Sequence, residues 1–228
     1  MGTTRHDLLP RGRTLALCGA VVAALALAGT AAADKEKIHL TKSGQAAARA
    51  AVLARSDLGP VSGWTGGTTK PDLSVSVPCT SYDPKQSDLV LNGAAKSVWK
   101  HAGLELESEA QVLQSPAMVR LDWQRTVLAP QMLPCLRSAL VKSLGASGKL
   151  VSFGRTAFPS LAAYARRYRA LVDVPTATGP VRVMVDIVLL GRGRTEITLS
   201  TTAPFAAESA IEPAELQLAR TLAGRIRM

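Results

Sequence analysis

Apolar and polar residues alternate along much of the second half of the chain. In the segment 104–114, apolar side chains on one side oppose three glutamates on the other, and this pattern is typical of a half-buried strand. Short turns separate neighbouring segments of this kind, which predicts antiparallel pairing. The expected strands are 90–101, 104–114, 149–158, 163–174, 181–190 and 196–202.

Helical patterns lie before, between and after these segments. An alanine-rich stretch, 41–56, predicts an N-terminal helix because alanine has the highest helix propensity. Ser115-Pro116 is typical of a helix start, and Ala129-Pro130 breaks the helix before it continues to Leu144. Glu212-Pro213 is expected to open a final helix. The chain is therefore predicted to be α+β, with an antiparallel sheet of about six strands packed by N-terminal, central (Pro-broken) and C-terminal helices.

Residues 1–33 have the pattern of a cleavable signal peptide. Three arginines precede the uncharged run 14–28, and small residues around Ala32 form an A-x-A site. We expect cleavage after Ala33, which leaves 34–228 as a single extracytoplasmic α+β domain, secreted and without a transmembrane helix. An uncleaved anchor is the alternative, although the apolar run is short for a span. Lipidation at Cys18 is disfavoured because Leu17 is not small.

The chain is strongly basic, with a formal net charge of +10. Export argues against nucleic acid, so an exported basic domain would meet anionic lipids or polymers of the envelope. Arginine used simply for solvated surface is the alternative interpretation. The candidate basic patch consists of Arg166, Arg169, Arg182, Arg192, Arg194 and Arg220.

No catalytic constellation is visible in the sequence. His39 and His101 have no orienting partner nearby, and the chain lacks the H-E-x-x-H and G-x-S-x-G motifs. Acidic residues are spread along strand and helix faces and are expected to be solvated, with Asp122 and Arg125 forming a surface pair on a helix. The sequence thus predicts no catalytic, cofactor-binding or metal-binding residue, no cofactor, and a protein that is not an enzyme.

The three tryptophans are the candidates for a ligand pocket. Trp64, Trp99 and Trp123 fall in a loop, a strand and a helix, and other aromatic residues are few. Ligand sites are mostly apolar with a few polar groups, so the three indoles are candidates to line one. Burial in the core is the alternative.

Two cysteines, Cys79 and Cys135, follow the predicted cleavage site. An even number of cysteines in an oxidising compartment favours a disulfide bond. Two buried thiols are the alternative, whereas the absence of a paired C-x-x-C argues against a metal site.

The layout resembles actinobacterial exported domains of the PknH-like extracellular sensor type. The resemblance rests on Ser56-Asp57-Leu58-Gly59 leading into Gly63-Trp64-Thr65, on Pro78-Cys79, on Cys135-Leu136, and on Gly193-Arg194-Thr195-Glu196 in a strand-rich end. It implies a non-catalytic domain that binds something in the cell envelope. Sensor domains of this type carry two disulfides, whereas this chain has cysteines for one after cleavage, and their binding residues cannot be transferred.

The function expected from the sequence is therefore binding of an unknown envelope ligand in a groove between sheet and helices. A protein-interaction or wall-associated module that uses the basic surface on an anionic polymer is the alternative. A hydrolase built on His39 or His101 would need a nucleophile or carboxylate close to the histidine.

The cysteine pairing gives the first testable prediction. Non-reducing peptide mapping of the exported protein should recover the Cys79 and Cys135 peptides as one linked species, because a disulfide would hold the weakly apolar segment around Cys79 to the central helix. Recovery of both thiols free would contradict the prediction.

Overall fold

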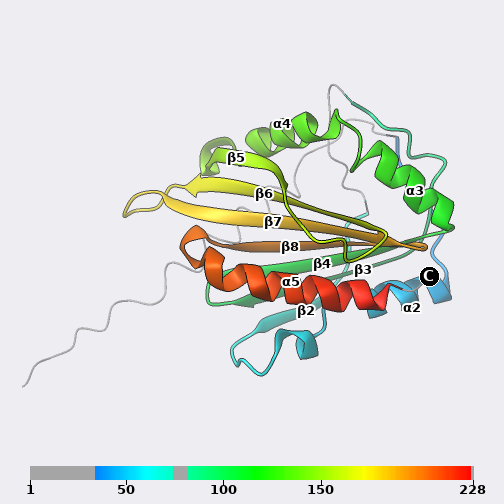
Figure 1. The fold of residues 1–228 in the computed structure, drawn as a ribbon, viewed down its shortest axis with the longest axis horizontal. Helices are drawn as coiled ribbons and strands as arrows, with labels where there is room; N and C mark the ends of the chain where they lie inside the picture. The colour runs from blue at the N-terminus through cyan, green and yellow to red at the C-terminus, as the bar shows by residue number, and fades with distance from the viewer. Residues whose placement is uncertain (1–33, 74–81, 227–228) are drawn as a thin grey trace, which may run out of the picture.

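The fold is built on one sheet of eight strands. The computed structural model describes residues 34–73 and 82–226. The strand order is β1-β3-β4-β8-β7-β6-β5, with β2 also paired to β3 (Figure 1). The strands are β1 (Lys37–Ile38), β2 (Thr65–Thr69), β3 (Val90–His101), β4 (Leu104–Leu113), β5 (Lys149–Thr156), β6 (Tyr164–Val174), β7 (Val181–Arg192) and β8 (Thr195–Pro204).

The predicted α+β class is confirmed, but the count of about six strands is too low. All six expected strands form, and each pairs antiparallel with its neighbour. The two additional strands are β1, which pairs parallel to β3, and β2. Both escape the pattern because β1 has only two residues, and because β2 is a Thr-Gly-Gly-Thr-Thr segment without apolar alternation.

Four α-helices complete the described fold. They are α2 (Lys42–Ala51), α3 (Pro116–Arg125), α4 (Met132–Leu144) and α5 (Glu208–Arg225). The Ser115 side chain caps α3 by accepting from the Met118 N–H, and the central helix is broken as predicted. The predicted start of α5 is wrong by four residues. Pro213 lies inside the helix, close enough to its start that the missing N–H removes only one early hydrogen bond. Within 34–73 and 82–226, no helix combines the length and apolar character needed for a membrane span.

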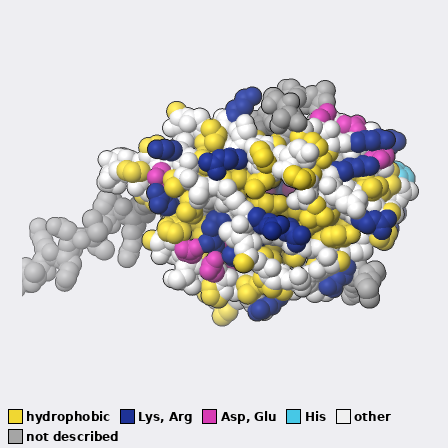
Figure 2. Space-filling view, turned by 45° about the horizontal axis from the view of Figure 1, so that its top comes forward, with side chains coloured by type: hydrophobic (Ala, Val, Ile, Leu, Met, Phe, Trp, Pro, Cys, Tyr) yellow, Lys and Arg dark blue, Asp and Glu magenta, His cyan; other side chains and the backbone are white. Residues whose placement is uncertain are grey.

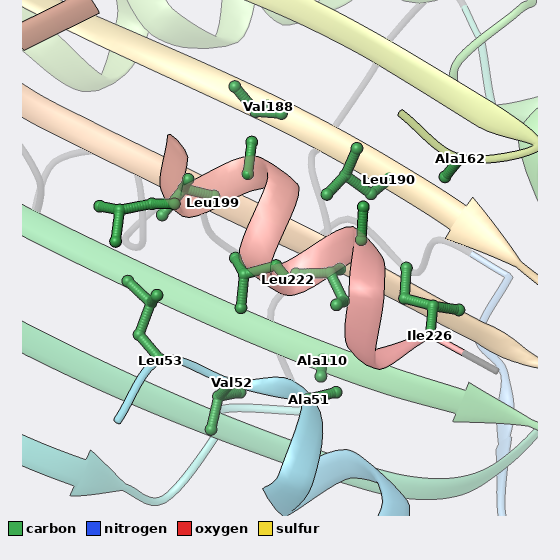
Figure 3. Close-up of a cluster of buried hydrophobic side chains, with 14 of the residues drawn as sticks. Ala51, Val52, Leu53, Ala110, Ala162, Val188, Leu190, Leu199, Leu222 and Ile226 are labelled. Carbon is green, nitrogen blue, oxygen red and sulfur yellow. The ribbon is translucent and has the colours of Figure 1, made fainter. Parts of the chain in front are cut away.

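Helices α2 and α5 cover one face of the sheet and bury the main hydrophobic cluster. In Figure 3, Leu222 of α5 and Ile226, which follows that helix, lie in one cluster with Leu190 and Leu199 of the sheet, and Val52, which follows α2, belongs to the same cluster. Odd-numbered positions of β8 and even-numbered positions of β7 supply this face. The alternate positions, including Ile187 and Leu189, therefore face the other side of the sheet.

Two glycines let α2 approach the sheet closely. A Cβ atom on Gly93 of β3 would lie 2.2 Å from the backbone carbonyl carbon of Gly44, and one on Gly44 would lie 2.3 Å from the carbonyl oxygen of Asn92. The backbones are thus in direct contact. This contact fixes α2 against β3 without intervening side chains.

A charged network fills the space between the sheet and the first turns of α5. Arg169 of β6 binds the buried carboxylate of Asp186 with two hydrogen bonds, both 2.6 Å long. Its guanidinium also donates to Glu208 and to Glu212 of α5. Fork-shaped pairing of this kind satisfies several acceptors at once, so the acidic residues on this face are compensated by an arginine.

Glu215 lies next to this network but is less well compensated. Its side chain is 1% exposed, and neither carboxylate oxygen has a hydrogen-bond partner. The nearest cation is Arg167, whose Nη1 lies 3.6 Å from Oε1. Burial, followed by the negative charge of Asp186, raises the pKa of Glu215 to about 7.

The position of Glu215 predicts how stability depends on pH. Since the folded state binds this proton more tightly than the unfolded state does, Glu215 favours folding most below its unfolded pKa of 4.5, and this contribution is lost as pH rises through about 7. The substitution Glu215→Gln should therefore raise the free energy of unfolding at pH 8 by up to about 3 kcal/mol. It should flatten the pH dependence between pH 4.5 and 7, as measured by urea denaturation.

Glu212→Gln on the same helix is the matched control. Glu212 accepts hydrogen bonds from Arg167 and Arg169, so its neutralisation should lower stability at neutral pH. Equal effects of the two substitutions would contradict the assignment of Glu215 as an uncompensated buried acid.

Candidate functional site

A cavity of about 570 Å³ lies on the face of the sheet opposite α5. Its walls come from alternate positions of the central strands, from α3 and α4, and from the segments around residues 34–38 and 83–86. The volume is in the range of pockets that hold small ligands.

Most of the cavity wall is apolar and rigidly packed. Trp123 of α3 stacks on Tyr164, with ring centroids 5.1 Å apart. Tyr168 stacks against Phe153 at 6.0 Å, and its hydroxyl donates to the carbonyl of Val127 at 3.0 Å. Further apolar lining comes from Leu73, Leu91, Met132, Leu136, Leu140, Ile187 and Leu189.

One end of the cavity is acidic. Four carboxyl groups from different parts of the chain meet there: Glu36 beside β1, Glu109 of β4, Asp122 of α3 and Glu196 of β8. The Asp122 carboxylate accepts from the Gln86 side chain at 3.0 Å. Oε1 of Glu196 is buried and has no hydrogen-bond partner.

The pKa values of all four groups are raised above their ordinary values. For Glu36, burial and the neighbouring charges of Asp122 and Glu109 raise the pKa to about 7. Burial is also the main cause of the raised pKa of Glu109 and of Asp122. For Glu196, burial and then the adjacent Asp122 carboxylate raise the pKa well above the usual range. The cluster thus retains protons at a pH where isolated carboxyl groups are ionised.

Arg125, at the end of α3, holds the segment 82–88 against the cavity. Its guanidinium binds both carboxylate oxygens of Asp88, at 2.6 and 3.1 Å, and donates to the carbonyl of Lys85 at 2.7 Å. The Tyr82 hydroxyl donates in turn to the carbonyl of Arg125. These four bonds fix the segment that carries Gln86.

Asp34 closes the same region from the N-terminal side. One of its carboxylate oxygens accepts from the backbone N–H groups of Gln86 and Ser87, and from the Ser87 hydroxyl, at 2.9–3.0 Å. These bonds lower the pKa of Asp34. The segment that places Glu36 in the cavity is therefore anchored to the segment that Arg125 holds.

The structure does not bring the three tryptophans around one pocket. Trp123 lines the cavity. Trp99 lies on the α2 and α5 face, where its indole N–H donates to the carbonyl of Leu53 at 3.3 Å. Trp64 packs against the same cluster, and its ring makes a tilted contact with His101, with centroids 5.2 Å apart. The prediction that the three tryptophans line one pocket is therefore wrong for Trp64 and Trp99. Strand β3 directs Trp99 to the face of the sheet opposite the cavity, and Trp64 packs against the cluster on that same face.

The six arginines do not form one patch either. Arg166 and Arg169 are on opposite faces of β6, Arg169 belongs to the α5 network, and Arg182 is bound to Asp173 at 2.8 Å. Arg192, Arg194 and Arg220 lie on β7, in the β7–β8 turn and on α5. Figure 2 likewise shows Lys and Arg side chains spread over the visible face.

The other predicted residues lie away from the cavity lining or outside the described residues. His101 is at the end of β3 beside Trp64, and His39 follows β1; neither is among the described lining residues. Cys135 is buried in α4. Cys79 lies outside the described residues, so its bond to Cys135 stays a prediction.

The acidic residues of the cavity are the functional candidates that sequence reasoning missed. The expected surface pair between Asp122 and Arg125 is wrong, because Asp122 accepts a hydrogen bond from Gln86 and Arg125 pairs with Asp88. Glu109 and Glu196 alternate with buried residues and were expected to face solvent, but α3 covers that face. The sequence did contain an indication of this arrangement. Helical segments lie before, between and after the strands, so helices were available to cover both faces of β4 and β8. Among the described residues, no group of three or more metal-ligating side chains is positioned to hold a metal ion.

The Arg125 contacts give a prediction about local opening. Arg125→Met should detach the segment 82–88 and speed hydrogen exchange of the Gln86 and Ser87 amides several-fold, because these amides are protected only while the segment stays docked. Hydrogen–deuterium exchange with peptide-level mass spectrometry measures this.

Arg120→Met is the matched control, since Arg120 is an exposed arginine of the same helix. It should leave exchange of 82–88 unchanged. Unchanged exchange in Arg125→Met as well would contradict the role assigned to Arg125.

No protein-family model matches the chain, and the search of curated proteins gives no match. The case for a function is therefore made from the cavity and its residues.

Proposed function

We propose that this chain is an exported, non-enzymatic domain that binds a small, partly apolar ligand of the cell envelope in the cavity beneath α3 and α4. The observation that carries the proposal is the cavity itself: about 570 Å³, walled largely by aromatic and aliphatic side chains, with a cluster of four carboxyl groups in the lining. Ligand pockets characteristically combine an apolar wall with a few convergent polar groups. The sensor-like layout of the sequence and its signal-like N-terminus support an envelope ligand.

The composition of the lining favours binding over catalysis. No Ser, Cys or His side chain is among the described lining residues, so a Ser–His or Cys–His catalytic pair is not placed in the described wall. The aromatic stacks and the Tyr168 hydrogen bond fix the wall. A fixed wall lowers the entropic cost of binding.

The alternative function, surface association with an anionic polymer, has less support. It requires a joint basic surface, whereas Arg169 and Arg182 are engaged by carboxylates and the remaining candidates are dispersed. A hydrolase built on His101 is also less supported, because that ring packs against Trp64 and is not among the described cavity lining.

Native mass spectrometry of the protein purified from its own host tests the proposal. The expected spectrum shows a protein species with an added small-molecule mass that organic solvent removes. Repeated recovery of apo protein alone, together with no thermal stabilisation by lipid or wall fragments, would contradict ligand binding.

A cavity-filling substitution makes the test specific to this site. Leu136→Trp should abolish the added mass because Leu136 of α4 lines the cavity and the larger indole would occupy the ligand volume. Leu133→Trp, on the same helix but not among the described lining residues, should retain it. Retention of the added mass in both variants would place the ligand elsewhere.

A further inference from the structure

We infer that the polar end of the ligand is a cationic amine and that its apolar tail lies along the aromatic wall; the inference rests on the proposed function. Both parts come from the described lining of the cavity. An acidic end and an apolar body, joined in one cavity, match a molecule that has a positive head and a hydrocarbon tail.

The ionisable residues of the described cavity lining are mostly acidic, although the protein as a whole is basic. The chain carries a formal net charge of +10. Seven of the described lining residues are acidic: Asp34, Glu36, Asp72, Asp83, Glu109, Asp122 and Glu196. Lys35 is the one basic residue in the described lining, and its side chain is exposed. The undescribed segment 74–81 contains no charged residue in its sequence, so it adds no cation to the cavity.

An unpartnered carboxylate oxygen marks where the head group would bind. Oε1 of Glu196 is buried without a hydrogen-bond partner, and so is the Oε1 acceptor of Gln86, another lining residue. Buried polar atoms in native proteins are nearly always paired. Two acceptors of this kind beside Asp122 require donors, and an ammonium group supplies three donors and a positive charge.

Two nearby cations, Lys96 and Arg125, are paired with carboxylates outside the cluster. Lys96 binds Glu107 at 2.7 Å, outside the described lining, and Arg125 binds Asp88. The groups that act on the cluster from the surrounding elements are Glu36 beside β1, Asp72 in the segment before residue 74, Lys96 of β3, Glu107 and Glu109 of β4, Asp122 and Arg125 of α3, and Glu196 of β8. The acidic groups therefore outnumber the cations around the cluster.

The close approach of these carboxyl groups couples amine binding to proton release. In the empty cavity the carboxyl groups hold protons, because burial and mutual repulsion disfavour their ionised forms. An ammonium ion entering the cluster favours the carboxylate form, so a carboxyl O–H bond breaks and the proton leaves to solvent. Binding at pH 6–7 should thus release protons, and affinity should increase as pH rises through about 7, the pKa of Glu36.

Three probes with the same tail test the head-group preference. Isothermal titration calorimetry of the purified full-length mature protein with dodecylamine, dodecanol and dodecanoate, each below its micelle concentration, should give the tightest binding for the amine. We expect at least a tenfold weaker affinity for the alcohol and no detectable binding of the carboxylate. Repeating the amine titration in buffers of different ionisation enthalpy measures the released protons.

A pair of substitutions tests the residues. Glu196→Gln should weaken dodecylamine at least tenfold while changing dodecanol binding less than twofold. Glu105→Gln is the matched control, since Glu105 is on the same face of β4 as Glu109 but is paired with Lys100 at 2.7 Å and is not among the described lining residues. It should bind both probes as the wild-type chain does. Circular dichroism confirms that each variant is folded.

The outcomes separate this inference from the proposed function. If dodecanol binds as tightly as dodecylamine, and Leu136→Trp abolishes both, the cavity binds ligands but the amine preference is wrong. If dodecylamine binds equally well to Glu196→Gln, the assignment of the head-group site is wrong. If no probe binds and the host protein carries no added mass, both the inference and the proposed function fail.

Discussion

Burying a carboxylate is unfavourable unless a cation or several hydrogen-bond donors accompany it, and the two faces of this sheet meet that requirement differently. On the α5 face, the guanidinium of Arg169 satisfies Asp186 and reaches two glutamates of the helix. On the α3 face, four carboxyl groups meet at the end of a cavity, and their raised pKa values show that protons compensate them instead. On the α3 face the protonated carboxyl groups line a cavity, where another cation can replace a proton. On the α5 face Arg169 holds its carboxylates, and Glu215, which also has a raised pKa, is 1% exposed and lies outside the described cavity lining. This difference makes the α3 face the functional one in our account.

The two faces of the sheet have different structural roles. Helices α2 and α5 pack tightly enough for backbone contact at Gly44 and Gly93, and they bury the main hydrophobic cluster (Figure 3). Helix α3 buries Val119 and Trp123 in a smaller hydrophobic cluster and is also held at its end by Arg125, through Asp88 and the carbonyl of Lys85. The polar contacts of Arg125 add to this packing, so the space beside Trp123 does not have to be filled with side chains. The face covered by α2 and α5 thus supports the sheet, and the face covered by α3 and α4 provides the cavity.

The sequence predicted the regular parts of the fold well. Six strands, the broken central helix and the Ser115 cap follow from alternation and capping residues, which act locally. The sequence did not reveal β1 or β2, since their pairing depends on β3 rather than on their own residues. The acidic site was missed for a related reason. Glu36, Asp122 and Glu196 are distant in sequence, and each alone has the pattern of a solvated residue. Only the placement of α3 over β4 and β8 makes them neighbours.

The central claim is that the cavity beneath α3 and α4 holds an amphiphile whose cationic head faces Glu196. A crystal structure of the mature protein with dodecylamine tests it most directly. Our account predicts continuous density for the alkyl chain between Trp123 and Tyr168, with the nitrogen within hydrogen-bond distance of Oε1 of Glu196. An empty cavity at saturating amine, or a chain bound with its nitrogen away from the carboxyl cluster, would contradict it.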